Sequence, residues 1–393
     1  MTICVPGNVL DALDGSGHRY HRLPRHQDFA VSKAADIRRA VEAVVEPSLR
    51  RRLADLGMIR EVTIDGATAR VGVTVPSPTW PAQALGEEIA SVVKGFDGVA
   101  DVAVDIAIMT ETDADELATR FREERAGTVG GTGSATRVIA IASGKGGVGK
   151  SSVAANTAVA LASAGHDVGV IDADVWGYSI PGMLGVTDSP AAVADLIVPP
   201  SAHGVRAISM DFFVGDDQAV IWRGPMLHKA LEQFLNDVWW DEPDFLFIDM
   251  PPGTGDVAIS ISQFLPRSQA IVVTTPQPTA QRVAKRAAAM AEKVSQDVLG
   301  VVENMSWFTG DDGKRYEIFG SGGGAELAAE LGVPLLGAVP LVPELRSGAD
   351  RGEPVHVAAP GSEAAEAFQA IALAIAESRP RVRTHPELVI RGD

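Results

Sequence analysis

The larger, carboxyl-terminal part of the chain alternates short apolar runs with longer stretches of helical periodicity. The apolar runs are RVIAIAS (137–143), DVGVIDA (167–173), FLFIDM (245–250), AIVVTT (270–275), VLGVVENM (298–305) and LLGAVP (335–340). Continuous runs of aliphatic residues separated by helices are typical of parallel strands that are covered by helices on both faces. The pattern predicts an α/β domain with a parallel sheet over residues 137–380.

A smaller set of elements comes before this domain. It begins with apolar residues at helical spacing and continues with two alternating segments that meet at an Asp-Gly turn, then a helical stretch and a last strand. These segments are KAADIRRAVEAVV (33–45), IREVTIDG (59–66), ATARVGVTV (67–75), ALGEEIASVVKGF (84–96) and ADVAVDIAIM (100–109). They predict a small α/β domain over residues 31–110.

Three segments lie outside the two predicted domains. Residues 1–30 have no sustained periodicity, and we expect a poorly ordered leader there, since chain ends are usually held by few contacts. Residues 111–136 begin with a charged helical stretch and end in TVGGTGSAT, whose composition is typical of a linker. Residues 381–393 form a short polar tail.

The amino-acid composition of the chain argues against several classes of function. The chain has 34 Lys and Arg against 51 Asp and Glu, a formal net charge of −17, which disfavours binding to nucleic acid or to an anionic membrane surface. The single cysteine, Cys4, excludes an intramolecular disulfide and a cysteine-rich metal site within one chain. The sequence has neither a signal-peptide pattern nor an apolar run of spanning length, so we expect a cytoplasmic protein.

The segment GKGGVGKS (144–151) fits the phosphate-loop pattern G-x-x-x-x-G-K-[ST] between a predicted strand and a predicted helix. Glycines let backbone N–H groups wrap phosphate oxygens, and the helix that follows adds its positive amino-terminal end. The pattern predicts that Lys150 neutralises β- and γ-phosphate charge and that Ser151 binds Mg²⁺. The predicted nucleotide-binding residues are Gly144, Gly146, Gly147, Val148, Gly149, Lys150, Ser151 and Ser152. The alternative is an ordinary glycine-rich turn.

Carboxylates follow two of the other apolar runs. Asp172 and Asp174 come at the end of the second run, where strands of this class abut the phosphates, and Asp249 closes the third. A carboxylate is required there to orient an attacking water and to support Mg²⁺. The alternative for Asp172 and Asp174 is that each caps the following turn.

The loop PPGTGD follows Asp249 directly. It offers backbone N–H groups and an acidic end, and a loop of this kind can be held in one nucleotide state and released in another. The predicted switch residues are Pro252, Gly253, Thr254, Gly255 and Asp256. Together with the phosphate loop and the carboxylates, this loop predicts a Mg²⁺-dependent ATPase.

Lys145 is a second lysine within the phosphate loop. Its spacing alone is compatible with a solvated side chain. However, KGGVGKS (145–151) resembles the signature of the deviant Walker A ATPases, the group that contains MinD, ParA and nitrogenase reductase. The resemblance implies a homodimer in which Lys145 reaches the nucleotide of the partner subunit and acts in catalysis with Lys150 and Asp174.

Further motifs resemble one family within that group, Mrp (ApbC), whose members are iron–sulfur cluster carriers with ATPase activity. The resemblance covers residues 137–378 and is carried by DADVWGYSIPGMLG, VIWRGPMLHKALEQFLNDVWW, FLFIDMPPGTGDVAISISQ, VVENMSWF and FGSGGG. Residues 33–110, with DLGMIREVTIDG and VDIAIMT, are similar to the SufT/PaaD-type domain often fused ahead of Mrp.

The resemblance implies roles for particular residues. Asp174 would act on the attacking water, Asp172 would support the magnesium shell together with Ser151 and Asp249, and Asn304 would read the adenine edge. The segment 339–348 would close over the base. For Asn304, the residues alone leave open an amide that caps a strand end.

The chain departs from the family at the cluster ligands. Relatives carry Cys-x-x-Cys shortly after the NMS segment, so that two subunits hold one 4Fe-4S cluster, whereas this chain reads NMSWFTGDDGKRYEIFG (304–320). In the small domain, Trp80-Pro81 stands where relatives often have Cys-Pro, and EPS (46–48) replaces their Asp-Pro-Glu. We therefore find no iron–sulfur ligands, since oxygen donors are poor substitutes for thiolate.

Two functions of different class follow. The first is an Mrp-like ATPase that acts in iron–sulfur cluster assembly or transfer, with apoproteins or assembly proteins as partners. The second is a cluster-free, nucleotide-driven dimer switch that regulates or positions a protein partner.

Overall fold

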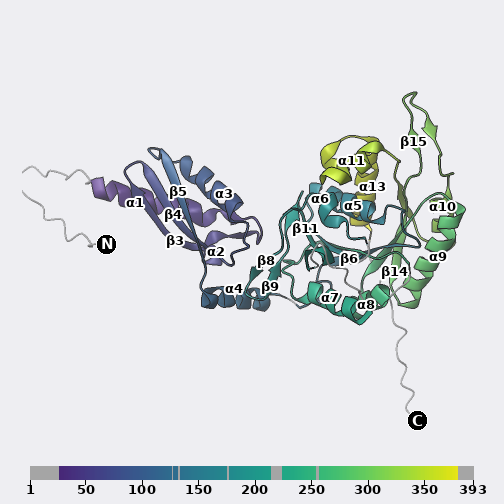
Figure 1. Cartoon of the computed structure of the whole chain (residues 1–393), viewed down its shortest axis with the longest axis horizontal. Helices are drawn as coiled ribbons and strands as arrows, with labels where there is room; N and C mark the ends of the chain where they lie inside the picture. The colour runs from purple at the N-terminus through teal and green to yellow at the C-terminus, as the bar shows by residue number, and fades with distance from the viewer. Residues whose placement is uncertain are drawn as a thin grey trace, which may run out of the picture. The chain divides into compact units, whose positions relative to one another are not determined.

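The computed structural model describes residues 26–125, 127–131, 133–174, 177–213, 224–253 and 256–378. The chain divides into two compact units, and each is described by itself (Figure 1). Of the described residues, the first contains those from 26 to 75 together with Ala82–Ile108. The second contains Pro76–Pro81 and the described residues from 109 to 378.

The first unit is a three-stranded sheet packed against helices. Strands β3 (Ile59–Asp65) and β4 (Thr68–Val75) form an antiparallel hairpin, and β5 (Asp101–Ile108) runs parallel to β4. The parallel connection passes through α3 (Ala82–Lys94), whose Leu85, Ile89 and Val93 are fully buried. Shorter elements complete the unit: β1 (Val45–Glu46), β2 (Arg51–Arg52) and α2 (Leu53–Leu56).

Helix α1 differs in extent from the prediction. It runs over His26–Ala43 and so begins before Lys33, inside the segment expected to be a leader. The sequence permits this extension, because no proline or glycine interrupts it between His26 and Lys33. Residues 1–25, which hold the rest of the expected leader, lie outside the described residues.

The second unit is built on an eight-stranded sheet of order β10-β11-β7-β12-β6-β13-β14-β17, in which only β10 is antiparallel to its neighbour. Its strands are β6 (Arg137–Ser143), β7 (Val168–Asp172), β10 (Ser201–Ala202), β11 (Val205–Ser209), β12 (Phe245–Asp249), β13 (Gln269–Thr274), β14 (Asp297–Glu303) and β17 (Leu335–Ala338). The chain moves to one side of β6 for β7, β11 and β12, and to the other side for β13, β14 and β17. Ligands of open α/β sheets bind where the winding reverses, outside the carboxyl ends of the strands.

Helices cover both faces of this sheet (Figure 1). Ile139 and Ile141 of β6 pack with α5, α6 and α13, whereas Val138 and Ala140 pack with α7 and α8. This alternation is the two-residue period of a strand that is buried on both sides. The helices are α5 (Lys150–Ser163), α6 (Ile180–Leu184), α7 (Gly224–Asn236), α8 (Asp256–Phe264), α9 (Pro278–Lys293), α10 (Gly323–Leu331), α11 (Pro343–Arg351), α12 (Val355–Ala358) and α13 (Glu363–Glu377).

All six apolar runs of the predicted parallel sheet form parallel strands, which confirms the predicted fold class. The strand β11 was not predicted, because Arg206 interrupts its apolar run. In the structure the Arg206 side chain is only 2% exposed and donates to Asp167 at 2.7 Å. The charge is thus buried with a partner, which the sequence pattern alone does not reveal. Other short elements lie outside the predicted set: β8 (Ala191–Val193), β9 (Leu196–Val198), β15 (Phe308–Thr309), β16 (Arg315–Tyr316) and η1 (Met210–Phe213).

The segment expected to connect the domains begins with α4 (Glu111–Glu124), which packs on the second unit. The ring of Phe121 stacks on that of Trp239 with centroids 4.3 Å apart. Just after the helix, Arg125 Nη2 donates to the Val238 carbonyl at 2.7 Å. These contacts fix α4 beside the end of α7.

The carboxyl-terminal helix α13 is tied to the start of the sheet. Arg137, the first residue of β6, donates to the Ile375 carbonyl and to Ser378 Oγ, both at 2.8 Å. The tail 381–393 lies outside the described residues. Within the part of the chain that is described, no helix is both long and apolar enough to cross a membrane.

Candidate nucleotide site

The phosphate loop connects β6 to α5 at the carboxyl edge of the sheet. Two of its glycines, Gly147 and Gly149, have φ values of +78° and +79°, a region that L side chains rarely adopt. A Cβ on Gly149 would lie 2.2 Å from Asn304 Nδ2, whereas Gly146 and Gly147 face open space. The loop is therefore held closely on one side and open on the other, as a phosphate cradle requires.

Lys150 and Ser151 open α5 and meet Asp249 at the end of β12. Lys150 Nζ lies 2.6 Å from Asp249 Oδ1, and Ser151 Oγ donates to Asp249 Oδ2 at 2.5 Å. The strand order explains the meeting, because β12 lies beside β6 with Asp249 opposite Ile141. Asp249 is fully buried and Lys150 is 6% exposed, so the two charges compensate each other away from water.

The two other predicted carboxylates lie at the end of the neighbouring strand. Asp174 Oδ2 is 3.5 Å from Lys150 Nζ, and Asp174 is 8% exposed. Asp172 is fully buried and accepts from the backbone N–H groups of Ser179, at 3.0 Å, and Ile180, at 3.1 Å. The structure thus brings together Lys150, Ser151, Asp172, Asp174 and Asp249.

The buried carboxylates have shifted acidities. Burial, and after it the nearby charge of Asp249, raises the pKa of Asp172 to about 7, although backbone N–H groups oppose the shift. Burial also raises the pKa of Asp249, while the charge of Lys150 and the hydrogen bonds from Lys150 and Ser151 act in the opposite direction. The site holds more negative charge than one ammonium group neutralises, which favours a further cation.

The second lysine of the loop lies apart from this cluster. Lys145 is half-buried, and its Nζ is 3.5 Å from Gln277 Oε1 at the start of α9. Gln277 was not singled out from the sequence, although it follows a predicted strand that ends at the same edge of the sheet as the phosphate loop. This position after a predicted strand was the feature of the sequence from which Gln277 could have been identified.

Asn304 supports the phosphate loop in the structure, whereas the recorded hydrogen bond of Ser152 lies within α5. Asn304 is 5% exposed, and its Nδ2 donates to the Val148 carbonyl at 2.9 Å. The Ser152 carbonyl accepts from Asn156 Nδ2, also at 2.9 Å, inside α5. The amide group of Asn304 therefore lies against the back of the phosphate loop in this structure.

The predicted switch loop is described in part. The Gly253 N–H donates to the Ser143 carbonyl at 3.0 Å, which holds the start of the loop on β6, and Pro252 is exposed. Thr254 and Gly255 lie outside the described residues, as does the side chain of Asp256, the first residue of α8.

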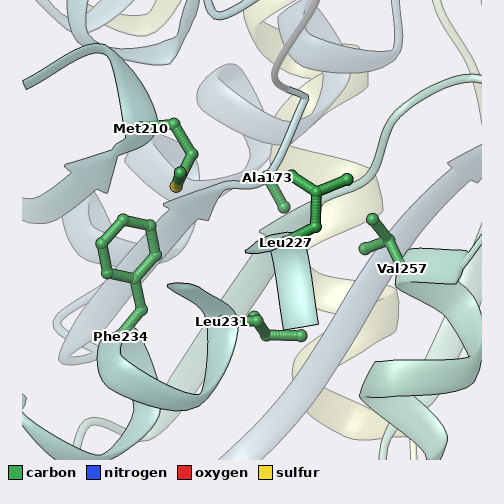
Figure 2. A pocket seen from close by; sticks show the side chains of 6 residues that line it. All are labelled: Ala173, Met210, Leu227, Leu231, Phe234 and Val257. Atoms are coloured by element: carbon green, nitrogen blue, oxygen red, sulfur yellow. The ribbon is translucent and has the colours of Figure 1, made fainter. Parts of the chain in front are cut away.

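An apolar pocket lies beside the strand that carries the carboxylates (Figure 2). Figure 2 shows its lining side chains, which come from the end of β7, from η1, and from α7 and α8: Ala173, Met210, Leu227, Leu231, Phe234 and Val257. Ala173 lies between Asp172 and Asp174 in the chain. The two helices are therefore packed against the residue that separates these carboxylates.

The segment where the family resemblance led us to expect Cys-x-x-Cys forms a small hairpin of β15 and β16. Glu363 at the start of α13 accepts from Trp307 Nε1 at 3.0 Å, from Thr309 Oγ1 at 2.8 Å and from Arg315 Nη2 at 2.5 Å. The Arg315 guanidinium also lies 4.4 Å from the centre of the Trp307 ring. Iron–sulfur clusters are held by thiolates, which these hydrogen-bond donors and aromatic rings do not supply.

We also searched the described residues for groups of side chains that could hold a metal ion by themselves. Among residues 26–378, apart from the undescribed gaps, no group of three or more His, Cys, Asp or Glu side chains is placed to hold a metal ion. In the small domain, Glu46 of the EPS segment is fully buried and accepts from the Leu49 N–H at 2.6 Å. Its carboxylate therefore shapes the local turn.

Comparison with known families agrees with this geometry. Residues 134–376 match the family model described as NUBPL iron-transfer P-loop NTPase, and residues 34–106 match a model described as iron-sulfur cluster assembly protein. A nucleotide-binding protein from Archaeoglobus fulgidus, solved in complex with ADP, superposes with a TM-score of 0.51 at 32% identity, covering 66% of this chain and 97% of its own. The fold and the site thus define a nucleotide-binding P-loop NTPase.

Curated relatives match over both units. A protein of Mycobacterium tuberculosis named iron-sulfur cluster carrier protein is 42% identical over 349 residues, covering 86% of this chain and 92% of its own. A protein of Deinococcus radiodurans with the same name is 43% identical over 354 residues, covering 89% and 96%. The chain belongs to the NUBPL-type family of iron-transfer P-loop NTPases. The matches confirm the resemblance drawn from the sequence motifs.

Proposed function

We propose that this protein binds and hydrolyses ATP with Mg²⁺ and that it acts in iron–sulfur cluster assembly or transfer. The observation that carries the first part is the buried cluster of Lys150, Ser151, Asp249 and Asp174 behind an open glycine loop. The names of the relatives and the match of the small domain support the second part.

The residues fit a nucleotide with a magnesium ion. Lys150 and the amino-terminal end of α5 supply positive charge to the β- and γ-phosphates. Ser151 and Asp249 would hold Mg²⁺, with Asp172 in the surrounding shell, and the ion would offset phosphate charge when bound. The raised pKa values of Asp172 and Asp249 support this fit, because a cation at the site would stabilise both carboxylates in their charged form.

Asp174 is the carboxylate that we assign to the attacking water. It is nearly buried but lies 3.5 Å from Lys150, so it faces the residue that would contact the γ-phosphate. Its oxygen would accept a hydrogen bond from the water and orient the lone pair toward phosphorus.

Lys145 and the dimer complete the proposal. Lys145 does not contact the cluster of its own subunit in this structure, and its Nζ is directed to Gln277. We assign it to the nucleotide of a second copy in a homodimer, where it would stabilise charge that develops on the phosphates. Asn304 would contact the base, beside the loop that it already supports through Val148.

A cluster would be cargo that this chain does not ligate with its own thiols. Its single cysteine, Cys4, lies outside the described residues, and the hairpin held by Glu363 offers no thiolate. In this function, an apoprotein or an assembly protein would provide the cluster ligands, and ATP binding would control the encounter.

The same hairpin favours a second candidate, a cluster-free dimer switch that acts on a protein partner. The carboxylate of Glu363 fixes the hairpin through three side chains, and Tyr316 remains 47% exposed on it. An exposed aromatic side chain on a fixed hairpin is suited to a protein contact.

The first part of the proposal is tested by the Lys150→Ala variant. Removing the ammonium leaves Asp249 buried without its positively charged partner and the phosphates without their main cation, so we expect the rate of ATP hydrolysis to fall by at least about 100-fold. Phosphate release is measured at saturating ATP and Mg²⁺.

The matched control is Lys285→Ala, which removes an exposed lysine that pairs with Glu330 on the surface of the same unit. It should hydrolyse ATP like the wild type. Wild-type turnover by the folded Lys150→Ala protein would show that the cluster is not the hydrolytic site.

A further inference from the structure

The loop lysine that we assign to a second subunit has a partner within its own chain. Lys145 Nζ donates to Gln277 Oε1 at 3.5 Å, and the Lys145 carbonyl accepts from Ser143 Oγ at 3.1 Å. The side chain is half-buried. Lys145 therefore contacts its own subunit, at the residue that precedes α9.

The partner of Lys145 is itself fixed. Gln277 Oε1 also accepts from Thr275 Oγ1 at 2.8 Å, which orients the amide oxygen toward the lysine. The Gln277 carbonyl accepts from the Ala280 N–H at 2.9 Å in the first turn of α9. The acceptor is thus held by both its side chain and its backbone.

The phosphate loop is also docked on α9 at a second point. A Cβ on Gly144 would lie 2.2 Å from the carbonyl carbon of Val283, so the backbones of the loop and the helix are in close contact. The contact of Gly144 therefore fixes the backbone next to Lys145 relative to α9, and Gln277 lies at the start of the same helix.

We propose that Gln277 is a positioning residue that retains Lys145 in cis, over its own loop, until a second nucleotide-bound subunit competes for the lysine. This inference rests on the proposed function of Lys145 in the dimer. A neutral amide at 3.5 Å is a weak acceptor for an ammonium group, so the restraint is one that phosphate oxygens can displace.

The charge of the acceptor makes the proposal testable. Gln277→Glu turns the contact into an ion pair of the same length and shape, so Lys145 should be retained more strongly. Gln277→Ala removes the acceptor and should release Lys145. A merely structural role for Gln277 would not move the two variants in opposite directions.

The first readout is the rate at which a small acylating reagent modifies Lys145 in the nucleotide-free protein, followed by peptide mass spectrometry. We expect the rate to fall by about two- to five-fold in Gln277→Glu and to rise in Gln277→Ala. Lys285, an exposed lysine on α9, is the internal control for the reactivity of the reagent. Equal Lys145 rates in the wild type and both variants would overturn the proposal.

The second readout is ATP turnover. Gln277→Glu should lower kcat with an unchanged KM for ATP, because the nucleotide still binds its own loop. In a Lys145→Ala background the same substitution should have no further effect. Gln233→Glu, which adds an identical charge at an exposed position of α7, is the matched control and should leave kcat unchanged.

The outcomes separate this inference from the function on which it rests. One outcome is that Lys145→Ala keeps wild-type turnover, while the acylation rate of Lys145 in the Gln277 variants still changes as proposed. In that case Gln277 retains the lysine, but the catalytic role proposed for Lys145 is wrong. If Gln277→Glu lowers kcat equally in the Lys145→Ala background, the lysine role stands and Gln277 does not act through it.

Discussion

At the scale of single residues, the site is defined by an imbalance of buried charge. Asp172 and Asp249 are fully buried, Asp174 is nearly so, and Lys150 is the buried ammonium group beside them. Burying a carboxylate without full compensation raises its pKa. The site therefore contains two carboxylates, Asp172 and Asp249, whose charged forms are disfavoured by burial.

The first prediction concerns Asp172. Its pKa in the folded protein is about 7 against an ordinary value of 3.8, so the folded state binds the proton more tightly than the unfolded state. Stability from this group is therefore present at low pH and is lost as pH rises through the window between these values. The Asp172→Asn variant has no such dependence.

As the pH rises from 5 to 8, the free energy of unfolding of the wild type should fall by about 2.5 kcal/mol relative to that of the variant. Urea unfolding without metal or nucleotide measures the difference, and Asp188→Asn, at an exposed carboxylate, is the control. A difference between Asp172→Asn and wild type that does not change with pH would contradict the charge imbalance.

The proximity of site residues was predictable where a known motif and the end of a predicted strand indicated the same position. Lys150, Ser151 and Asp249 were assigned from the sequence, and the structure brings them within hydrogen-bond distance. Gln277 and Glu363 were not predicted, because neither belongs to a known motif whose parts are expected to meet. Without such a motif, a single sequence does not show which distant residues are in contact.

At the scale of elements, the apolar runs were sufficient to predict the central strands. Runs of aliphatic residues have few alternatives to a buried strand when helices flank them. The strand β11 was missed because Arg206 breaks its pattern, and the start of α1 was missed because a leader was expected there. The hairpin of β15 and β16 depends on Glu363 in a distant helix, so no local pattern predicts it.

The hairpin gives a prediction at this scale. Hydrogen bonds from Thr309, Trp307 and Arg315 outweigh partial burial and lower the pKa of Glu363. Glu363→Ala removes the common acceptor, so backbone amides of the hairpin should exchange with solvent at least several-fold faster. Hydrogen exchange followed by mass spectrometry on peptides spanning residues 307–317 measures the change.

The control for this experiment is Glu366→Ala, one turn further along α13 at an exposed position. It should leave exchange in the hairpin unchanged. Equal protection of the hairpin in Glu363→Ala and the wild type would mean that Glu363 does not hold it.

At the scale of the whole molecule, two compact units are joined in one chain, and each matches a family model concerned with iron or iron–sulfur assembly. The net charge of −17 disfavours nucleic acid as a partner. We propose that the nucleotide-binding unit acts as a switch that sets when the chain engages a protein partner.

The central claim is that this chain holds nucleotide with its own side chains but does not hold a cluster with them. The most direct measurement is iron, acid-labile sulfide and ATP turnover on one preparation that is purified without oxygen and then reconstituted with iron and sulfide. The account predicts Mg²⁺-dependent ATP hydrolysis and no stable, stoichiometric 4Fe-4S cluster after desalting. A stoichiometric cluster retained by the Cys4→Ser protein would contradict it.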